Sequence, residues 1–272
     1  MHKTEFANHL LHALTHRKIR PLLQTRDEYG EIFVYEQSGR RVLTFDERFE
    51  QSAMHLQQPY LPSHRYVRAM LMVLAFCTPS KVLHLGLGGG ALVRALAALQ
   101  PDCQHIAVEL RASVKHIAEQ YFLTPDTLPD NTQLRVVCDD ARRFIRAQPA
   151  ESFDIIFSDI YLANGMDVSQ KSCRYLADCA AALSNSGWLV LNFTRLPAFD
   201  DPSFLTLEGL FEEILIASVD AANYVIFASK RALPRPLAAY APAIKKLSQQ
   251  LNIDLLRQFK HLMQCRDFFQ RP

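Results

Sequence analysis

The stretch KVLHLGLGGG (residues 81–90) decides the fold, because it joins an apolar strand to a glycine-rich turn that opens a helix. Gly86, Gly88 and Gly90 let the backbone turn sharply and let a ligand approach the amide groups at the start of that helix. Glu109 ends the next apolar run, where a carboxylate binds ribose hydroxyls in nucleotide-binding folds. Together these features predict a site for a cofactor that contains a nucleoside.

The same alternation of strand and helix continues on the carboxyl side of this stretch. Five short apolar runs are separated by helical text: KVLHLGLGGG, HIAVEL, LRVVCDDA, FDIIFSDI and WLVLNF. This alternation predicts a parallel sheet with helices on both faces. Residues 211–219 and 224–230 are two more strands, and the turn between them is too short for a crossover, so they must be antiparallel.

We therefore predict an α/β fold with a Rossmann-like sheet of five parallel strands and an antiparallel terminal hairpin. It resembles the sheet of S-adenosylmethionine-dependent transferases. An NAD(P) enzyme is disfavoured, because the sixth strand of a dinucleotide dehydrogenase is parallel. Three parts are expected along the chain: 1–62, an N-terminal helix (4–24) and small β domain; 63–232, the nucleoside-binding catalytic domain; and 233–272, a helical extension. In the first part we expect a β hairpin over 31–37 and 40–45 and a loop over 52–63.

Composition excludes several classes of protein. The 272 residues are 49% hydrophobic and 21% charged with a net charge of +2, which argues against a disordered chain, a fibre or a membrane span. The six cysteines contain no CxxC pair, so we expect free thiols in the cytoplasm and no metal. Residues 27–229 carry a net charge of −9, which suits a cationic small molecule, whereas residues 230–272 carry +7. Without an RGG-type tract we expect no nucleic acid partner.

Two aspartates follow the third and fourth parallel strands. Asp140 and Asp159 should face the same cleft as the glycine turn, since ligands of open α/β sheets bind outside the carboxyl ends of the strands. Asp140 is placed to accept a hydrogen bond from an adenine amino group, and Asp139 should point the other way. Asp159 would lie beside the reactive centre, where a carboxylate attracts a cation or takes a proton. The alternative for Asp159 is a structural cap on the next helix.

Over roughly residues 27–230 the order of these motifs resembles the spermidine/spermine synthase (polyamine aminopropyltransferase) family. LGLGGGALVR is similar to the family's glycine loop, and CDDARRFI and FDIIFSDI to its adenine-binding and catalytic segments. The resemblance implies that Glu109 and Asp140 bind ribose and adenine, and that Asp159 is the catalytic aspartate. It also implies that Gln51 binds the donor, that Tyr66 lines the acceptor pocket and that the protein is a homodimer.

Two departures from the family pattern leave the reaction open. The loop aspartate that meets the aminopropyl ammonium of decarboxylated S-adenosylmethionine is Gly89 here, and the second aspartate of the catalytic loop is Leu162. The first hypothesis is transfer of an aminopropyl group from decarboxylated S-adenosylmethionine to a small amine. The alternatives are a methyltransferase that uses intact S-adenosylmethionine, favoured by Gly89, and a non-catalytic nucleoside-binding homologue, favoured by Leu162.

Overall fold

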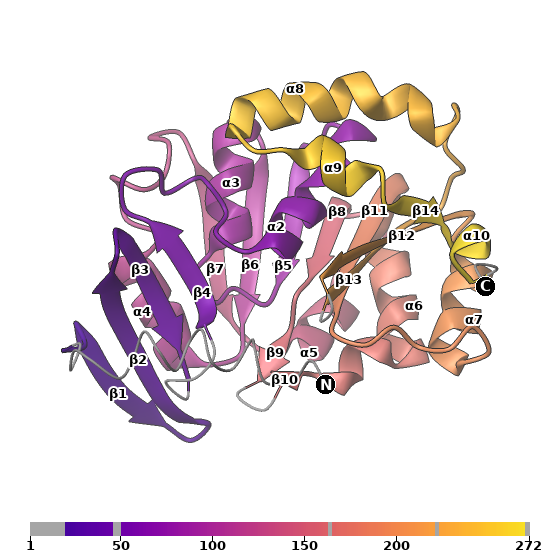
Figure 1. Ribbon diagram of the computed structural model, residues 1–272. Coiled ribbons are helices and arrows are strands. Elements are labelled where there is room, and N and C mark those ends of the chain that lie inside the picture. The colour runs from indigo at the N-terminus through magenta and orange to yellow at the C-terminus, as the bar shows by residue number, and fades with distance from the viewer. Residues whose placement is uncertain (1–19, 46–49, 163–164, 221–222, 270–272) are drawn as a thin grey trace, which may run out of the picture.

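The computed structural model describes residues 20–45, 50–162, 165–220 and 223–269, and it is built around one eight-stranded sheet (Figure 1). Across the sheet the strands run in the order β14, β12, β13, β11, β8, β5, β6, β7. Their bounds are β5 Lys81–Leu85, β6 Gln104–Glu109, β7 Gln133–Cys138, β8 Phe153–Ser158, β11 Leu183–Phe193, β12 Glu213–Asp220, β13 Asn223–Ser229 and β14 Leu262–Gln264.

The five central strands are parallel, as predicted. β5 lies between β6 and β8, β7 pairs with β6, and β11 pairs with β8, all in parallel. β13 then pairs antiparallel with both β11 and β12, which confirms the terminal hairpin. This places the carboxyl ends of five strands at one edge of the sheet, where the glycine turn lies.

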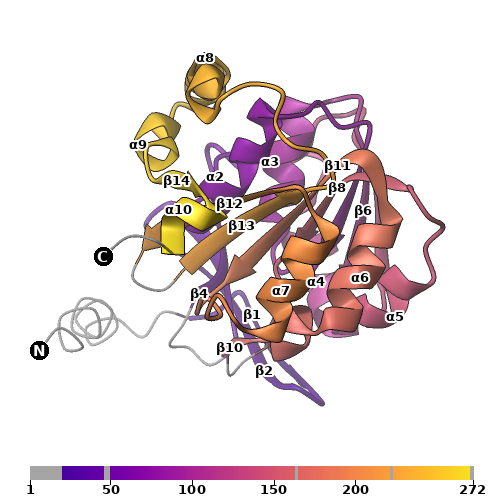
Figure 2. The ribbon, with the colours of Figure 1, turned by 90° about the vertical axis from the view of Figure 1, so that its right-hand side faces the viewer.

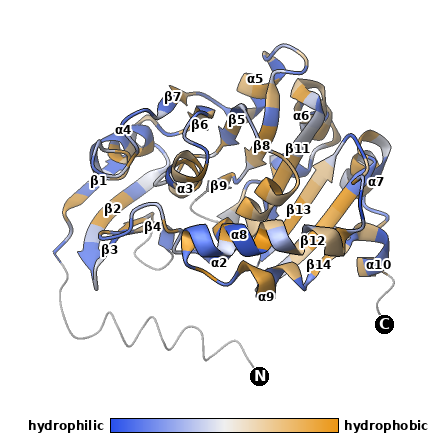
Figure 3. Cartoon of the chain, turned by 90° about the horizontal axis from the view of Figure 1, so that it is seen from above, coloured by the Kyte–Doolittle hydropathy of each residue, from blue (hydrophilic) through white to orange (hydrophobic). Residues whose placement is uncertain are grey.

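Helices cover both faces of this sheet (Figure 2). One face packs against α2, η1, α3, α8 and α9, and the other against α5, α6, α7 and α10. The helices are α2 Arg65–Met70, α3 Ala91–Leu99, α4 Ala112–Tyr121, α5 Ala141–Arg146, α6 Cys173–Ala182, α7 Pro202–Leu210, α8 Ala241–Leu251, α9 Leu255–Phe259 and α10 Cys265–Phe269, with 3-10 turns η1 Leu71–Ala75, η2 Val168–Lys171 and η3 Leu237–Tyr240. In Figure 3 the strands β12 and β13 are hydrophobic, as expected of strands covered on both faces.

A separate four-stranded antiparallel sheet precedes the main sheet. Its strands are β1 Leu23–Asp27, β2 Gly30–Gln37, β3 Arg40–Thr44 and β4 Glu50–His55, paired in that order. β2 and β3 confirm the expected hairpin, but residues 52–55 belong to β4 and not to a loop, because Ser52 to Met54 are all buried and pair with β3. The predicted helix at 4–24 is wrong at its end, where β1 begins, and its first part lies outside the described residues.

The basic C-terminal part packs against the main sheet through α8 and α9. Ile244, Leu247, Leu251 and Leu255 of α8 and α9 are buried in the core beside α2 and η1, as the amphipathic pattern predicts. The short strand β14 was not expected, and it extends the sheet beside β12. Among the described residues, no helix is long and apolar enough to cross a membrane, and no cluster of side chains could hold a metal ion.

Candidate functional site

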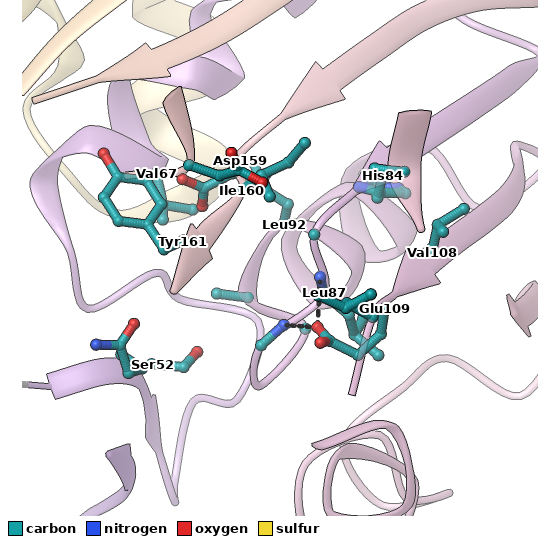
Figure 4. Close-up of a pocket in the computed structure, with 18 of the residues that line it drawn as sticks. Ser52, Val67, His84, Leu87, Leu92, Val108, Glu109, Asp159, Ile160 and Tyr161 are labelled. Carbon is teal, nitrogen blue, oxygen red and sulfur yellow. Dashed lines mark hydrogen bonds between the residues drawn. The ribbon is translucent and has the colours of Figure 1, made fainter. Parts of the chain in front are cut away.

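A pocket of about 670 Å³ opens at the carboxyl ends of β5, β6 and β8, a size suited to a ligand as large as a nucleoside. It is bounded on one side by β4 of the small sheet and on the other by α2. All the residues that the sequence nominates for the site line this pocket: Gln51, Tyr66, Gly86, Gly88, Gly90, Glu109, Asp140 and Asp159. Figure 4 shows part of this lining.

The glycine turn requires glycine because of its backbone angles and because another backbone segment lies close to it. Gly86, Gly88 and Gly90 have φ of 92°, 51° and 70°, which side chains rarely allow. A Cβ atom on Gly86 would lie 2.2 Å from the backbone oxygen of Asp159. The turn therefore contacts the backbone at Asp159. This contact fixes the position of Asp159 relative to the glycine turn.

Glu109 is buried and is held by the backbone of the glycine turn. One carboxylate oxygen accepts hydrogen bonds from the backbone N–H groups of Leu87 and Gly88, both at 3.3 Å, drawn as dashed lines in Figure 4. The other oxygen accepts from the N–H of Arg111 at 3.0 Å. Burial raises the pKa of Glu109, and these three hydrogen bonds act against that rise. The carboxylate is thus fixed at the end of β6, where a ribose would lie.

Asp140 lies in the pocket but is already engaged by α5. It caps that helix by accepting from the N–H groups of Arg142 and Arg143, and its carboxylate forms an ion pair with the Arg142 guanidinium at 2.7 Å. The hydrogen bond from Arg142 is the main reason that the pKa of Asp140 is lowered. Asp139 also borders the pocket, and its carboxylate pairs with the exposed guanidinium of Arg143.

Asp159 follows β8 and is held by side chains instead of by backbone. Its Oδ1 accepts from the Asn192 amide at 2.8 Å, and the Tyr66 hydroxyl forms a second hydrogen bond with the carboxylate. Burial raises the pKa of Asp159 to about 6, although both hydrogen bonds oppose the rise. The next element is the strand β9 (Tyr161–Leu162), so Asp159 does not cap a helix.

Two tyrosines, Tyr66 and Tyr161, interact with the Asp159 carboxylate. Tyr66 is the second residue of α2, and burial together with the charge of Asp159 raises its pKa well above the usual value. The Tyr161 ring lies beside Asp159 in Figure 4, and burial likewise raises its pKa. The two phenols therefore stay neutral at physiological pH, so that Tyr66 can donate to the carboxylate.

Asn192 and Asn223 were missed by the sequence analysis. Asn192 on β11 is fully buried and accepts a hydrogen bond from the Asn223 amide at 3.0 Å, while its own amide group reaches Asp159. Asn223 begins β13 and lines the pocket. A signal did exist, because Asn192 is a polar residue at the end of the otherwise apolar run WLVLNF. A buried polar residue at that point requires a partner.

Glu50, the first residue of β4, lines the pocket and is paired with Arg40. Glu50 forms two hydrogen bonds with the Arg40 guanidinium, at 3.0 and 2.9 Å, and lies 3.7 Å from the His64 imidazole. Burial lowers the pKa of His64, which keeps the ring neutral. The Glu50 charge is consequently balanced within the protein by Arg40.

Gly89 packs directly against Ser52 of β4. A Cβ atom at Gly89 would lie 2.8 Å from the Ser52 hydroxyl oxygen and 3.1 Å from the Phe122 ring. The position where the resemblance places an aspartate is therefore filled by a serine from the small sheet. The second departure, Leu162, lies on β9, which pairs with β10 (Gly165–Met166).

Comparison with known proteins finds similar sequences and folds, although no family model matches the chain. The chain is 29% identical over 241 residues to the polyamine aminopropyltransferase of Vibrio vulnificus, covering 84% of this chain and 78% of that protein. It is 24% identical to the enzyme of that name from Chromobacterium violaceum, covering 87% and 88% of the two chains.

Solved structures show the same fold. A probable spermidine synthase from Corynebacterium glutamicum superposes with a TM-score of 0.71 at 18% identity, covering 84% of this chain and 86% of that one. A human methyltransferase-like protein 13 in complex with SAH superposes with a TM-score of 0.54 at 20% identity, covering 72% and 93%. The chain is thus similar in sequence to polyamine aminopropyltransferases and in fold to a spermidine synthase, and these similarities support a transferase.

Proposed function

We propose that this transferase moves an aminopropyl group from decarboxylated S-adenosylmethionine to a small amine. The observation that carries the proposal is Asp159, whose backbone lies against the glycine turn and whose partly buried carboxylate is hydrogen-bonded by Tyr66 and Asn192. Since these partners are neutral, the charge of Asp159 remains available to a cationic ligand.

The donor is proposed to lie along the glycine turn. Glu109 would bind the ribose hydroxyls and Asp140 the adenine, while Gln51 approaches from β4. Because Gly86 lies against the backbone of Asp159, a donor bound along this turn would have its sulfonium end beside the carboxylate. Support for a donor of this kind comes from a solved spermidine synthase in complex with the transition-state analogue AdoDATO, which superposes with a TM-score of 0.64.

Asp159 would act on the acceptor amine. The amine nitrogen attacks the carbon next to the sulfonium, a C–N bond forms, the C–S bond breaks and methylthioadenosine leaves as a neutral thioether. The acceptor is an ammonium ion in solution and must lose a proton before its nitrogen can attack, and Asp159, ionised above a pKa of about 6, can accept that proton and pass it to solvent. The product nitrogen remains a secondary ammonium ion. Holding both substrates in line supplies most of the rate.

The three parts of the chain would then share the work. The β domain would contribute Gln51, the central domain the glycine turn together with Tyr66 and Asp159, and the C-terminal extension packing. A homodimer is also part of the proposal, and sedimentation equilibrium of the purified chain tests it.

A transfer assay tests the reaction. Purified protein is incubated with decarboxylated S-adenosylmethionine and a panel of primary amines from 1,3-diaminopropane to spermine, and products are identified by mass spectrometry. We expect an aminopropylated amine and methylthioadenosine in equal amounts. If no amine is modified while methylthioadenosine still binds, the chain is a nucleoside-binding homologue and not an aminopropyltransferase.

A second candidate, methyl transfer from intact S-adenosylmethionine, is favoured by one observation. Next to Gly89 the pocket presents the Ser52 hydroxyl in place of a carboxylate, which removes a repulsion toward the carboxylate of the intact donor. The double variant Gly89→Asp, Ser52→Gly makes room for an aspartate. If Gly89 sets donor choice, this variant shifts the ratio of binding constants toward the decarboxylated donor by at least tenfold, with Ser52→Gly alone as control. An unchanged ratio would eliminate the donor-switch argument.

A further inference from the structure

A row of three polar side chains crosses neighbouring strands at the acceptor end of the pocket. Asp159 follows β8, Asn192 lies on β11 and Asn223 starts β13. The register places Asp159 level with Asn192, because Ser158 on β8 is opposite Leu191 on β11, and it places Asn223 two residues before Val225, the partner of Asn192 on β13. The Asn192 amide donates a hydrogen bond of 2.8 Å to Asp159, and the Asn223 amide donates one of 3.0 Å to Asn192.

Hydrogen-bond chemistry fixes the direction of this row. An ionised carboxylate can only accept, so the NH₂ group of Asn192 must face Asp159. The carbonyl oxygen of Asn192 must then face Asn223, which therefore turns its own NH₂ group toward Asn192. The remaining group of the Asn223 amide is its carbonyl oxygen. Since Asn223 lines the pocket, this oxygen is what Asn223 offers to a ligand.

We propose that Asn223 recognises the acceptor amine through its side-chain carbonyl oxygen, in an orientation that Asp159 sets through Asn192. This inference rests on the proposed function for the identity of the ligand as an amine. The acceptor class is then a primary amine that donates one N–H group to a carboxylate and another to an uncharged carbonyl. Asn192 is a positioning residue, because it acts through Asp159 and Asn223 on either side of it.

The row also depends on the charge of Asp159. The titratable groups that face this carboxylate are Tyr66 from α2 and Tyr161 from β9, and burial keeps both phenols neutral. Protonation of Asp159 near pH 6 makes one of its oxygens a donor, which allows the Asn192 amide to reverse. The amide of Asn223 is then released as well.

Side-chain amide NMR of the free protein tests the row without any turnover. We expect the NH₂ signals of Asn192 and Asn223 to shift together with a midpoint near pH 6, and the shift to vanish in Asp159→Asn. Asn185 is the internal control, since it lies on the same strand and donates to Glu151, a carboxylate at the opposite end of the sheet. Independent titration of Asn192 and Asn223, or no titration, would overturn the orientation mechanism.

Calorimetric binding of 1,4-diaminobutane, in the presence of methylthioadenosine, tests recognition. Asn223→Ala should weaken binding about tenfold, the effect of one hydrogen bond to a charged group, whereas Asn185→Ala should leave it unchanged. In an Asn192→Leu background the same change should cost less than threefold, because the Asn223 amide is no longer oriented. Melting temperatures of all variants check that they are folded.

The outcomes separate the two proposals. If the wild-type protein binds the diamine and loses affinity in Asn223→Ala but transfers no aminopropyl group, the recognition stands and the proposed function fails. If transfer occurs and Asn223→Ala binds the diamine as tightly as the wild type, the recognition fails alone. Equal losses in both backgrounds would show that Asn192 does not orient Asn223, and a wild-type protein that binds no amine would overturn the proposal.

Discussion

The carboxylates of Glu109 and Asp159, both in the pocket, are held in different ways. Glu109 accepts from three backbone N–H groups, whereas Asp159 accepts from the side chains of Tyr66 and Asn192. A backbone cradle depends on the glycine turn and not on neighbouring side chains. The half around Glu109 thus depends on the fold, while the half around Asp159 can change with single substitutions, and we propose that it specifies the reaction.

The largest expected effect is on the Asp159 side. Asp159→Asn keeps the shape of the side chain but removes the charge and the proton acceptor, so kcat should fall about 10³-fold. Donor binding should change less than threefold, since the donor is proposed to be held by the other half. Rates at saturating amine and calorimetric donor binding measure both, and an undiminished rate would remove Asp159 from the catalytic role.

Gly86 joins the two halves, and a side chain there should damage both. Gly86→Ala places a Cβ atom against the Asp159 backbone at a φ of 92°, and we expect a loss of about 3 kcal/mol in the free energy of unfolding. Gly39 is the matched control, because its φ is also positive, at 73°, but nothing lies within 4 Å of an added Cβ. Gly39→Ala should cost about 1 kcal/mol in urea unfolding. Equal costs would show that the contact at Gly86 is not tight.

The charge of Asp159 should also reduce stability in a defined pH range. Burial raises its pKa from 3.8 to about 6, so ionisation is less favourable in the folded than in the unfolded state. Its contribution to the free energy of unfolding is therefore lost as the pH rises from about 4 to above 6, by about 3 kcal/mol in all. Asp159→Asn should match the wild type near pH 4 and be more stable at pH 7.5.

Urea unfolding of both proteins at the two pH values measures this difference. A variant that is less stable at pH 7.5 would show that the ionised carboxylate is well compensated in the folded state. The same ionisation should appear in the reaction, where kcat is expected to decline as the pH falls through about 6.

The smallest effect is expected on the backbone-held side. Glu109→Gln keeps the acceptor oxygen for one set of backbone N–H groups but turns an NH₂ group toward the other. Donor binding should weaken about tenfold, while kcat at saturating donor should stay within threefold. A loss in kcat equal to that of Asp159→Asn would contradict the division between the two halves.

The sequence predicts some parts of the pocket better than others. The glycine turn, Glu109 and Asp159 are visible because each stands at a strand end in an alternating pattern. Asn223 is not, because its role depends on the lateral register of β11 and β13, which no local pattern encodes. The engagement of Asp140 by Arg142 was likewise hidden, since a helix cap and a ligand contact use the same residue type.

The small sheet shows a different limit. Pro59 and Pro62 made the region after residue 52 look like a loop, yet β4 ends at His55, before either proline. The strand is recognisable only once β3 pairs with it, and it then delivers Gln51 and Ser52 to the pocket.

The nucleoside site and the choice of donor are both tested by calorimetric titration with decarboxylated S-adenosylmethionine, intact S-adenosylmethionine and methylthioadenosine. We expect all three ligands to bind, because the backbone-held half recognises their common nucleoside, and we expect the decarboxylated donor to bind most tightly. Tighter binding of the intact donor would contradict aminopropyl transfer and favour methyl transfer. Binding of none of the three would contradict the nucleoside site itself.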